Sequence, residues 1–127
     1  MQGEGWEAYT DNGREHTGRD VIEWAREAAS LGAGEILLTS VDQEGTRKGM
    51  DNALIAAVTE AVNIPVVASG GAGSTGHIID AVQHGADAVA LADMLHYERN
   101  DLVDIRDAML LAGISVRRVG TTIGEAA

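Results

Sequence analysis

The chain has 127 residues, which is enough for one domain with a hydrophobic core. Its formal net charge of −11 disfavours binding to nucleic acid or to an anionic membrane surface. It contains no cysteine, which excludes disulfides, thiol catalysis and cysteine-ligated metal. The amino terminus has no secretory-signal pattern and no apolar run is long enough to span a bilayer, so we expect a cytoplasmic protein.

The first thirty residues predict a hairpin that leads into a helix. Residues 6–10 can form a short strand, and the Asn-Gly pair that follows is a strong signal for a tight hairpin turn. Thr17 and Asp20 have the spacing of a capping box. Apolar residues then recur with a helical period over 21–29, which predicts a helix there.

Repeated strand and helix signals fill the rest of the chain. Three apolar runs are typical of strands covered on both faces of a parallel sheet, at residues 35–41, 64–68 and 87–92. Helices are expected at about 52–62, 75–84 and 101–111, capped by Asp51 or Asn52, by Ser74 or Thr75, and by Asp101. Residues 31–38 and 84–91 echo each other, which indicates repeated βα units. We expect one domain over residues 1–119 and a disordered tail over 120–127.

A glycine-rich turn within residues 64–75 is the strongest single motif. The order IPVVASGGAGST predicts a buried strand, a tight turn and a helix start. Gly70, Gly71 and Gly73 can leave their N–H groups open to a ligand, and a helix amino terminus is a natural anion site. Two interpretations stay open: a phosphate site, or a turn whose glycines serve only its geometry.

Three segments carry a resemblance to a known family, namely GAGEILLTS at 32–40 with Gly45 and Gly49, ASGGAG at 68–73 and GADA at 85–88. They resemble the carboxy-terminal half of the cyclase subunit of imidazole glycerol phosphate synthase, a (βα)8 barrel of histidine biosynthesis. The resemblance covers about residues 5–119. It implies an α/β fold: a partial TIM barrel, or half-barrel, with units six to eight, plus the hairpin insertion and helix of unit five. The core of strand five is absent.

The resemblance also implies a reaction and its partners. The family cyclises a phosphoribulosyl aminoimidazole carboxamide, a long substrate with a phosphate at each end, using ammonia from a glutaminase subunit and no cofactor. Two aspartates, on strands one and five, act as acid and base there, and neither position is present in this chain. We therefore expect a chain that is inactive alone and that forms a homo-oligomer or joins a complementary amino-terminal half-barrel.

Phosphate-binding residues are implied at the carboxyl ends of three strands. The backbone groups that hold phosphate in the family match Gly45, Gly71, Ala92 and Asp93, and the glycine-rich turn adds Ala72 and Gly73. Asp93 departs from the family, in which a serine is usual. An ionised carboxylate donates no hydrogen bond, so this departure predicts weaker phosphate binding.

Charged residues near these positions have a functional and a structural interpretation. Glu44 matches an acidic position of the family that is usually aspartate. Glu44 is therefore either a catalytic residue or a solvated loop carboxylate. Glu35 matches a charged residue of the ammonia gate at the barrel floor, or it simply faces solvent. Arg47 and Lys48 either reach a phosphate or are solvated. The four histidines lack metal-binding spacing, so no metal is expected and they are interpreted as structural or surface residues.

Three functions stay open on these grounds. In the first, the chain is a cyclase half that acts only with its missing half. In the second, it is a phosphate-binding or inert module that self-associates. The third is a divergent paralogue that works with another amidotransferase, which the departures at Glu44 and Asp93 suggest.

Overall fold

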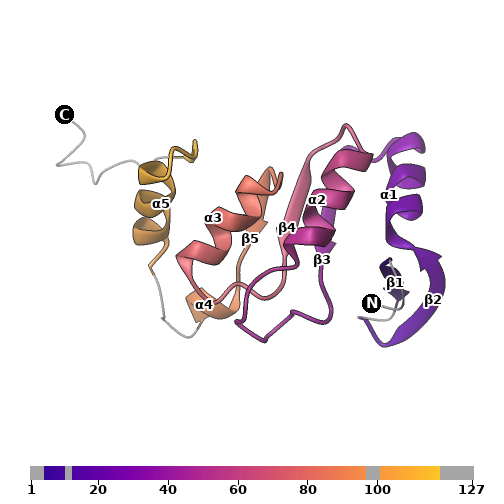
Figure 1. Ribbon diagram of the computed structural model, residues 1–127, viewed down its shortest axis with the longest axis horizontal. Helices are drawn as coiled ribbons and strands as arrows, with labels where there is room; N and C mark the ends of the chain where they lie inside the picture. The colour runs from indigo at the N-terminus through magenta and orange to yellow at the C-terminus, as the bar shows by residue number, and fades with distance from the viewer. Residues whose placement is uncertain (1–4, 11–12, 97–100, 118–127) are drawn as a thin grey trace.

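The structure is a computed structural model, which describes residues 5–10, 13–96 and 101–117 (Figure 1). A hairpin is followed by alternating helices and strands. The elements are β1 (Glu7–Thr10), β2 (Glu15–Asp20), α1 (Val21–Ser30), β3 (Ile36–Thr39), α2 (Asn52–Ala61), β4 (Val66–Ser69), α3 (Thr75–Gln83), β5 (Ala88–Ala90), α4 (Asp93–His96) and α5 (Leu102–Leu111). The predicted tail over 120–127 lies outside the described residues. None of the described helices has the length and apolar character that a bilayer span requires.

The main sheet has three parallel strands in the order β3, β4, β5. Ile36 lies opposite Val66, and Ser69 lies opposite Ala90, so the three strands end at the same edge of the sheet. The order of the strands in the sheet is the same as their order along the chain. Helix α2 connects β3 to β4, and helix α3 connects β4 to β5. Figure 1 shows these units side by side in chain order. The predicted parallel sheet with outer helices, of the kind that a half-barrel has, is confirmed.

The helices cover only one face of this sheet. Val66 and Ala68 of β4 are buried on the helix side. On the opposite face Leu37 of β3 is 65% exposed, and Ala88 and Ala90 of β5 are exposed as well. The expectation of strands covered on both faces is therefore wrong for the described residues. Three strands do not curl into the eight-stranded barrel that would enclose this second face.

The core consists of three small clusters between the sheet and the helices. The first joins α1, α2 and β4 around Val58, the second joins α2, β4 and α3 around Ala68, and the third joins α3 and α5 around Ile78. The side chains of these clusters are aliphatic or methionine, as expected for a chain with 3% aromatic residues, and Ser40 is the buried polar residue among those described. Each helix therefore packs on its neighbours along the row.

The internal echo in the sequence corresponds to one αβ turn that occurs twice. Gly32 after α1 has φ +103° and Gly85 after α3 has φ +115°, the left-handed region that glycine tolerates. In both turns the alanine after the glycine donates its N–H to the carbonyl five residues before it. The same turn then delivers the chain into β3 and into β5.

The hairpin and the helix caps follow local sequence signals, with one exception. β1 pairs antiparallel with β2, as predicted. The capping box is wrong, because Thr17 lies inside β2 and its hydroxyl donates to the carbonyl of Ala8. Asp20 caps α1 instead, accepting from the N–H of Glu23 at 3.0 Å. The other caps are among the residues expected: Asp51, Ser74 and Asp101.

A carboxylate holds the two hairpin strands together. Glu7 Oε2 lies 2.5 Å from His16 Nδ1, and Glu7 Oε1 accepts from the N–H of Gly18 at 3.1 Å. The hydrogen bond with His16 lowers the pKa of Glu7 below its ordinary value. The ionised form of Glu7 is therefore favoured in the folded hairpin.

The folding stability should depend on pH through Glu7. Its pKa is lower in the folded than in the unfolded chain, so its stabilising contribution is complete above the unfolded value and is lost as pH falls through the folded value. The unfolding free energy, measured by denaturant titration, should fall less in Glu7→Gln than in the wild type when the pH is lowered from about 7 to about 3. The control is Glu15→Gln, an exposed carboxylate of β2. Equal pH dependence of wild type and Glu7→Gln would contradict the assignment.

Candidate phosphate site

The loop of residues 42–49 packs directly on the glycine-rich turn of residues 70–73. Gly49 donates its N–H to the carbonyl of Gly71 at 2.9 Å. A Cβ on Gly71 would lie 2.2 Å from the carbonyl oxygen of Gly49, and a Cβ on Gly73 would lie 2.2 Å from that of Arg47. These two glycines are therefore required by backbone-to-backbone packing, whether or not a ligand binds.

Gly70 brings an acidic side chain over the same turn. It has φ +98°, and a Cβ there would lie 2.8 Å from the carbonyl oxygen of Ser40 and 3.1 Å from Glu44 Oε2. The backbone of the loop is closed by short-range bonds, among them one from the N–H of Glu44 to the carbonyl of Ser40 at 3.0 Å. The absence of a side chain at Gly70 thus lets the carboxylate of Glu44 approach the end of β4.

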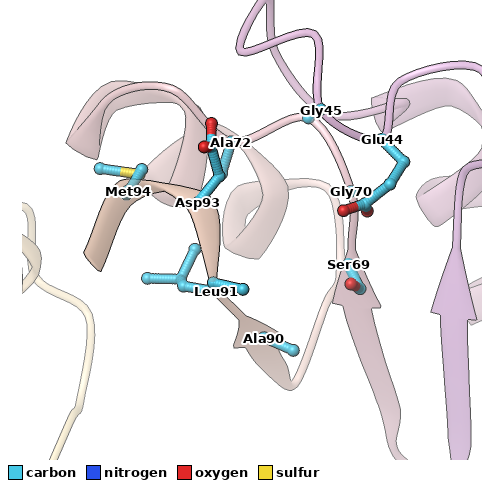
Figure 2. Close-up of a pocket in the computed structure, with 11 residues that line it drawn as sticks. Glu44, Gly45, Ser69, Gly70, Ala72, Ala90, Leu91, Asp93 and Met94 are labelled. Atoms are coloured by element: carbon cyan, nitrogen blue, oxygen red, sulfur yellow. The ribbon is translucent and has the colours of Figure 1, made fainter. Parts of the chain in front are cut away.

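A small pocket of about 120 Å³ lies where β4 and β5 end. Figure 2 shows Glu44 and Asp93 on opposite sides of it. The lining residues that the sequence also indicated are Glu44, Gly45, Gly70, Gly71, Ala72, Ala92 and Asp93. The others are Ser69, Ala90, Leu91 and Met94. Pockets for whole drug-sized ligands usually measure about 300–1,000 Å³, so this one fits a single small group.

Two of the predicted site residues lie elsewhere. The N–H of Gly73 donates to His77 Nδ1 at 3.0 Å, and Gly73 is not part of the pocket lining. Glu35 is exposed and comes immediately before β3, at the amino end of the strand. The pocket is at the carboxyl ends, so Glu35 lies at the opposite edge of the sheet.

An ion pair at the pocket joins two segments that are far apart in the sequence. Arg47 Nε lies 2.9 Å from Oδ2 of Asp93, the first residue of the short helix α4. The side chain of Arg47 is 49% exposed and that of Asp93 is 24% exposed. The sequence did not predict this pair. The only available signal was that both residues follow parallel strands, whose carboxyl ends meet at one edge.

A larger groove of about 750 Å³ adjoins the pocket along the unpaired edge of β3. Its walls come from β1, α1 and β3, and Glu44 lines both the groove and the pocket. Trp6 forms part of the wall and donates its indole N–H to Asp51 Oδ2 at 3.2 Å. Glu44 therefore lies at the junction of the pocket, which fits one small group, and the groove, which has room for a longer molecule.

The histidines take structural or surface roles where they are described. His77 accepts from Gly73, His16 contacts Glu7, and His84 Nδ1 lies 2.6 Å from the carbonyl of Asp80. Within residues 5–10, 13–96 and 101–117, no three His, Cys, Asp or Glu side chains are grouped so that they could hold a metal ion.

Parallel βα units whose helices lie on one face of the sheet, with a pocket at the carboxyl ends of the strands, are typical of barrel-type α/β proteins, whose sites lie at that end. The family described as Histidine biosynthesis protein matches residues 2–101. The chain belongs to this family, and the resemblance stated from the sequence is confirmed.

The relatives are longer than this chain. It is 50% identical over 113 residues to a protein from Mycobacterium leprae named imidazole glycerol phosphate synthase subunit HisF, covering 89% of this chain and 43% of that protein. The protein of the same name from Mycobacteroides abscessus is also 50% identical over 113 residues, with 44% of it covered. The chain thus spans less than half the length of these curated relatives.

A solved structure has the same fold. A chain of the BexX/CysO complex from Amycolatopsis orientalis superposes with a TM-score of 0.62 over 79% of this chain and 44% of the other. The sequence identity is 24%, so this likeness concerns the fold alone.

The packing of the loop on the glycine-rich turn can be tested by adding one methyl group. Gly71→Ala should lower the unfolding free energy by more than about 2 kcal/mol, because it combines a left-handed φ with a clash against Gly49. Gly32→Ala is the matched control, since Gly32 also has a left-handed φ but open space around its Cβ position. It should cost about 1 kcal/mol. Equal losses in denaturant titrations would show that the contact is unimportant.

Proposed function

We propose that this chain is the carboxy-terminal half of a cyclase-type (βα)8 barrel of histidine biosynthesis. It would contain units six to eight, together with the hairpin and helix of unit five. In this role it binds one phosphate end of a phosphoribulosyl aminoimidazole carboxamide substrate. The 50% identity to HisF proteins supports the family part of this proposal.

The observation that carries the phosphate assignment is the gathering of residues from three separate segments around one pocket. Gly45 comes from the loop after β3, Gly71 from the turn after β4, and Ala92 from the segment after β5. These are the backbone positions expected from the family resemblance. The volume of about 120 Å³ fits one phosphate group and excludes the rest of a long substrate. The adjoining groove, with Glu44 at the junction, then offers space for the remainder.

Catalysis requires groups that this chain does not supply. General acid–base catalysis contributes about 10²–10⁴-fold for each positioned group, and the two aspartates implied by the resemblance belong to strands one and five. Glu44 is the acidic residue at the carboxyl edge that the resemblance marks as a catalytic candidate, and it reaches the pocket from one side only. The isolated chain is therefore inactive, and Glu44 contributes once the missing half is present.

Ammonia-dependent cyclisation tests this proposal. The chain alone should give no turnover, and adding the amino-terminal half of a HisF relative should restore it. Glu44→Gln should lower the restored rate by about 10²-fold if Glu44 takes part in proton transfer. Glu60→Gln, an exposed carboxylate of α2, is the control and should leave the rate unchanged. Turnover by the chain alone near that of a full-length cyclase would refute the proposal.

A partner for the open face of the sheet is part of the same proposal. Leu37 is 65% exposed there, and β3 and β5 are each paired on one side only among the described strands. Unpaired strand edges and exposed apolar side chains favour association. The partner is either a second copy, related by twofold symmetry, or a complementary amino-terminal half-barrel. If the partner is a second copy, the alternative function is that of a module that self-associates.

Self-association can be measured by light scattering. The wild-type chain should form an oligomer at micromolar concentration, and Leu37→Glu should raise the dissociation constant by about tenfold or more. Leu31→Glu is the control, because Leu31 is 80% exposed but lies in the turn after α1 rather than on the sheet. A well-folded wild-type monomer would contradict the prediction, as would equal effects of the two variants.

A glutaminase partner belongs to the same proposal. Glu35 lies at the amino edge of the sheet, away from the pocket, which agrees with a role at the floor where ammonia enters. The cytoplasmic location expected from the sequence stays a prediction.

A further inference from the structure

We infer that Asp93 is an internal competitor of the ligand: it holds Arg47 in an ion pair, and a phosphate group must take Arg47 from Asp93 in order to bind tightly. This inference rests on the proposed phosphate pocket and names the residue pair that sets its affinity. It assigns Arg47 as the cation of the site, although Arg47 is not itself part of the pocket lining.

The pocket needs a cation from outside its walls. Its described lining residues include two carboxylates, Glu44 and Asp93, and none of those residues is positively charged. A dianionic phosphate that faced both carboxylates would be repelled. The ion pair brings the guanidinium of Arg47 to within 2.9 Å of one of them, so a compensating charge stands at the edge of the site.

The backbone holds Arg47 at this edge. Arg47 has φ +59°, and it is the one non-glycine residue with a left-handed φ among the described residues. This conformation is unfavourable for a residue with a Cβ and persists only where packing enforces it. The enforcing contact is the carbonyl of Arg47 against Gly73, where no side chain would fit. The loop therefore aims Arg47 at the end of β5 even though its own conformation opposes this.

The side chains can exchange partners. The side chain of Arg47 is 49% exposed, and exposed ion pairs are weak, so its contact with Asp93 is easily broken. The planar guanidinium can bind a phosphate through two parallel hydrogen bonds, which add both energy and geometric specificity. Figure 2 shows the carboxylate of Asp93 pointing towards the rim near Ala72, away from Leu91 and Ala90. The exchange thus takes place at the mouth of the pocket and favours phosphate monoesters over singly charged carboxylates.

A double-mutant cycle with inorganic phosphate as the probe tests this competition. The variants are Asp93→Asn, Arg47→Gln and the double variant, titrated at one pH and ionic strength. Asparagine keeps the size of Asp93 and still suits a helix start, and glutamine leaves the backbone conformation of position 47 as unfavourable as before. Controls that change the same charge on exposed helix residues that do not line the pocket are Glu60→Gln for Asp93 and Arg26→Gln for Arg47.

Asp93→Asn should tighten phosphate binding by roughly three- to fivefold, because Arg47 no longer has to leave the carboxylate of Asp93. In the Arg47→Gln background the same change should give a gain of less than about twofold, since only direct repulsion by Asp93 is relieved. Arg47→Gln alone should weaken binding more than Arg26→Gln does. The Nε–H resonance of Arg47 should shift when phosphate is added to the wild type.

The possible outcomes separate this inference from the function on which it rests. If Asp93→Asn raises the phosphate affinity as much or more in the Arg47→Gln background as in the wild-type background, then Arg47 only screens Asp93 and the inference is overturned. If the wild type binds phosphate and Asp93→Asn does not bind it more tightly, the inference fails while the phosphate pocket stands. If no variant binds phosphate in a saturable way, the proposed phosphate pocket and the inference fall together.

Discussion

The site depends on one contact, in which the loop of residues 42–49 lies on the glycine-rich turn of residues 70–73. Two main chains approach so closely there that a Cβ on Gly71 or Gly73 would overlap a carbonyl oxygen. The contact brings the loop after β3 to the end of β4, and through Arg47 it also reaches the start of α4. The pocket exists because three separate segments meet in this way, and none of them forms it alone.

The second constraint is the one-sided sheet. Helices on one face provide the core, while Leu37 of β3 and Ala88 and Ala90 of β5 on the other face stay exposed. The parallel strands order their carboxyl ends along one edge and so position the pocket, but three strands are too few to enclose it. The same geometry that builds the site therefore leaves it open on the side where a closed barrel would have further strands. This is why the proposed function includes a partner surface.

The charge of the pocket limits how an anion could bind there. The chain is 50% identical to HisF proteins but spans less than half their length. Within that span it has Glu44 and Asp93 at the pocket, in a chain whose net charge is −11. An anion can bind there only through backbone N–H groups and a cation that offsets those carboxylates. Arg47 meets the second requirement from a neighbouring position.

The sequence by itself determined the features that depend on local signals. Asn-Gly predicted the hairpin, Asp51 and Ser74 capped their helices, and apolar runs located all three parallel strands, although each strand is shorter than its run. Family resemblance added five of the residues that line the pocket, namely Glu44, Gly45, Gly71, Ala92 and Asp93. Only the tertiary structure decided which face of the sheet is covered, that Gly73 donates to His77, and that Arg47 pairs with Asp93. The covered face of the sheet and the ion pair depend on segments that are distant in the chain. The hydrogen bond between Gly73 and His77 depends on how the turn bends back onto α3. Periodicity and spacing carry no information about such contacts.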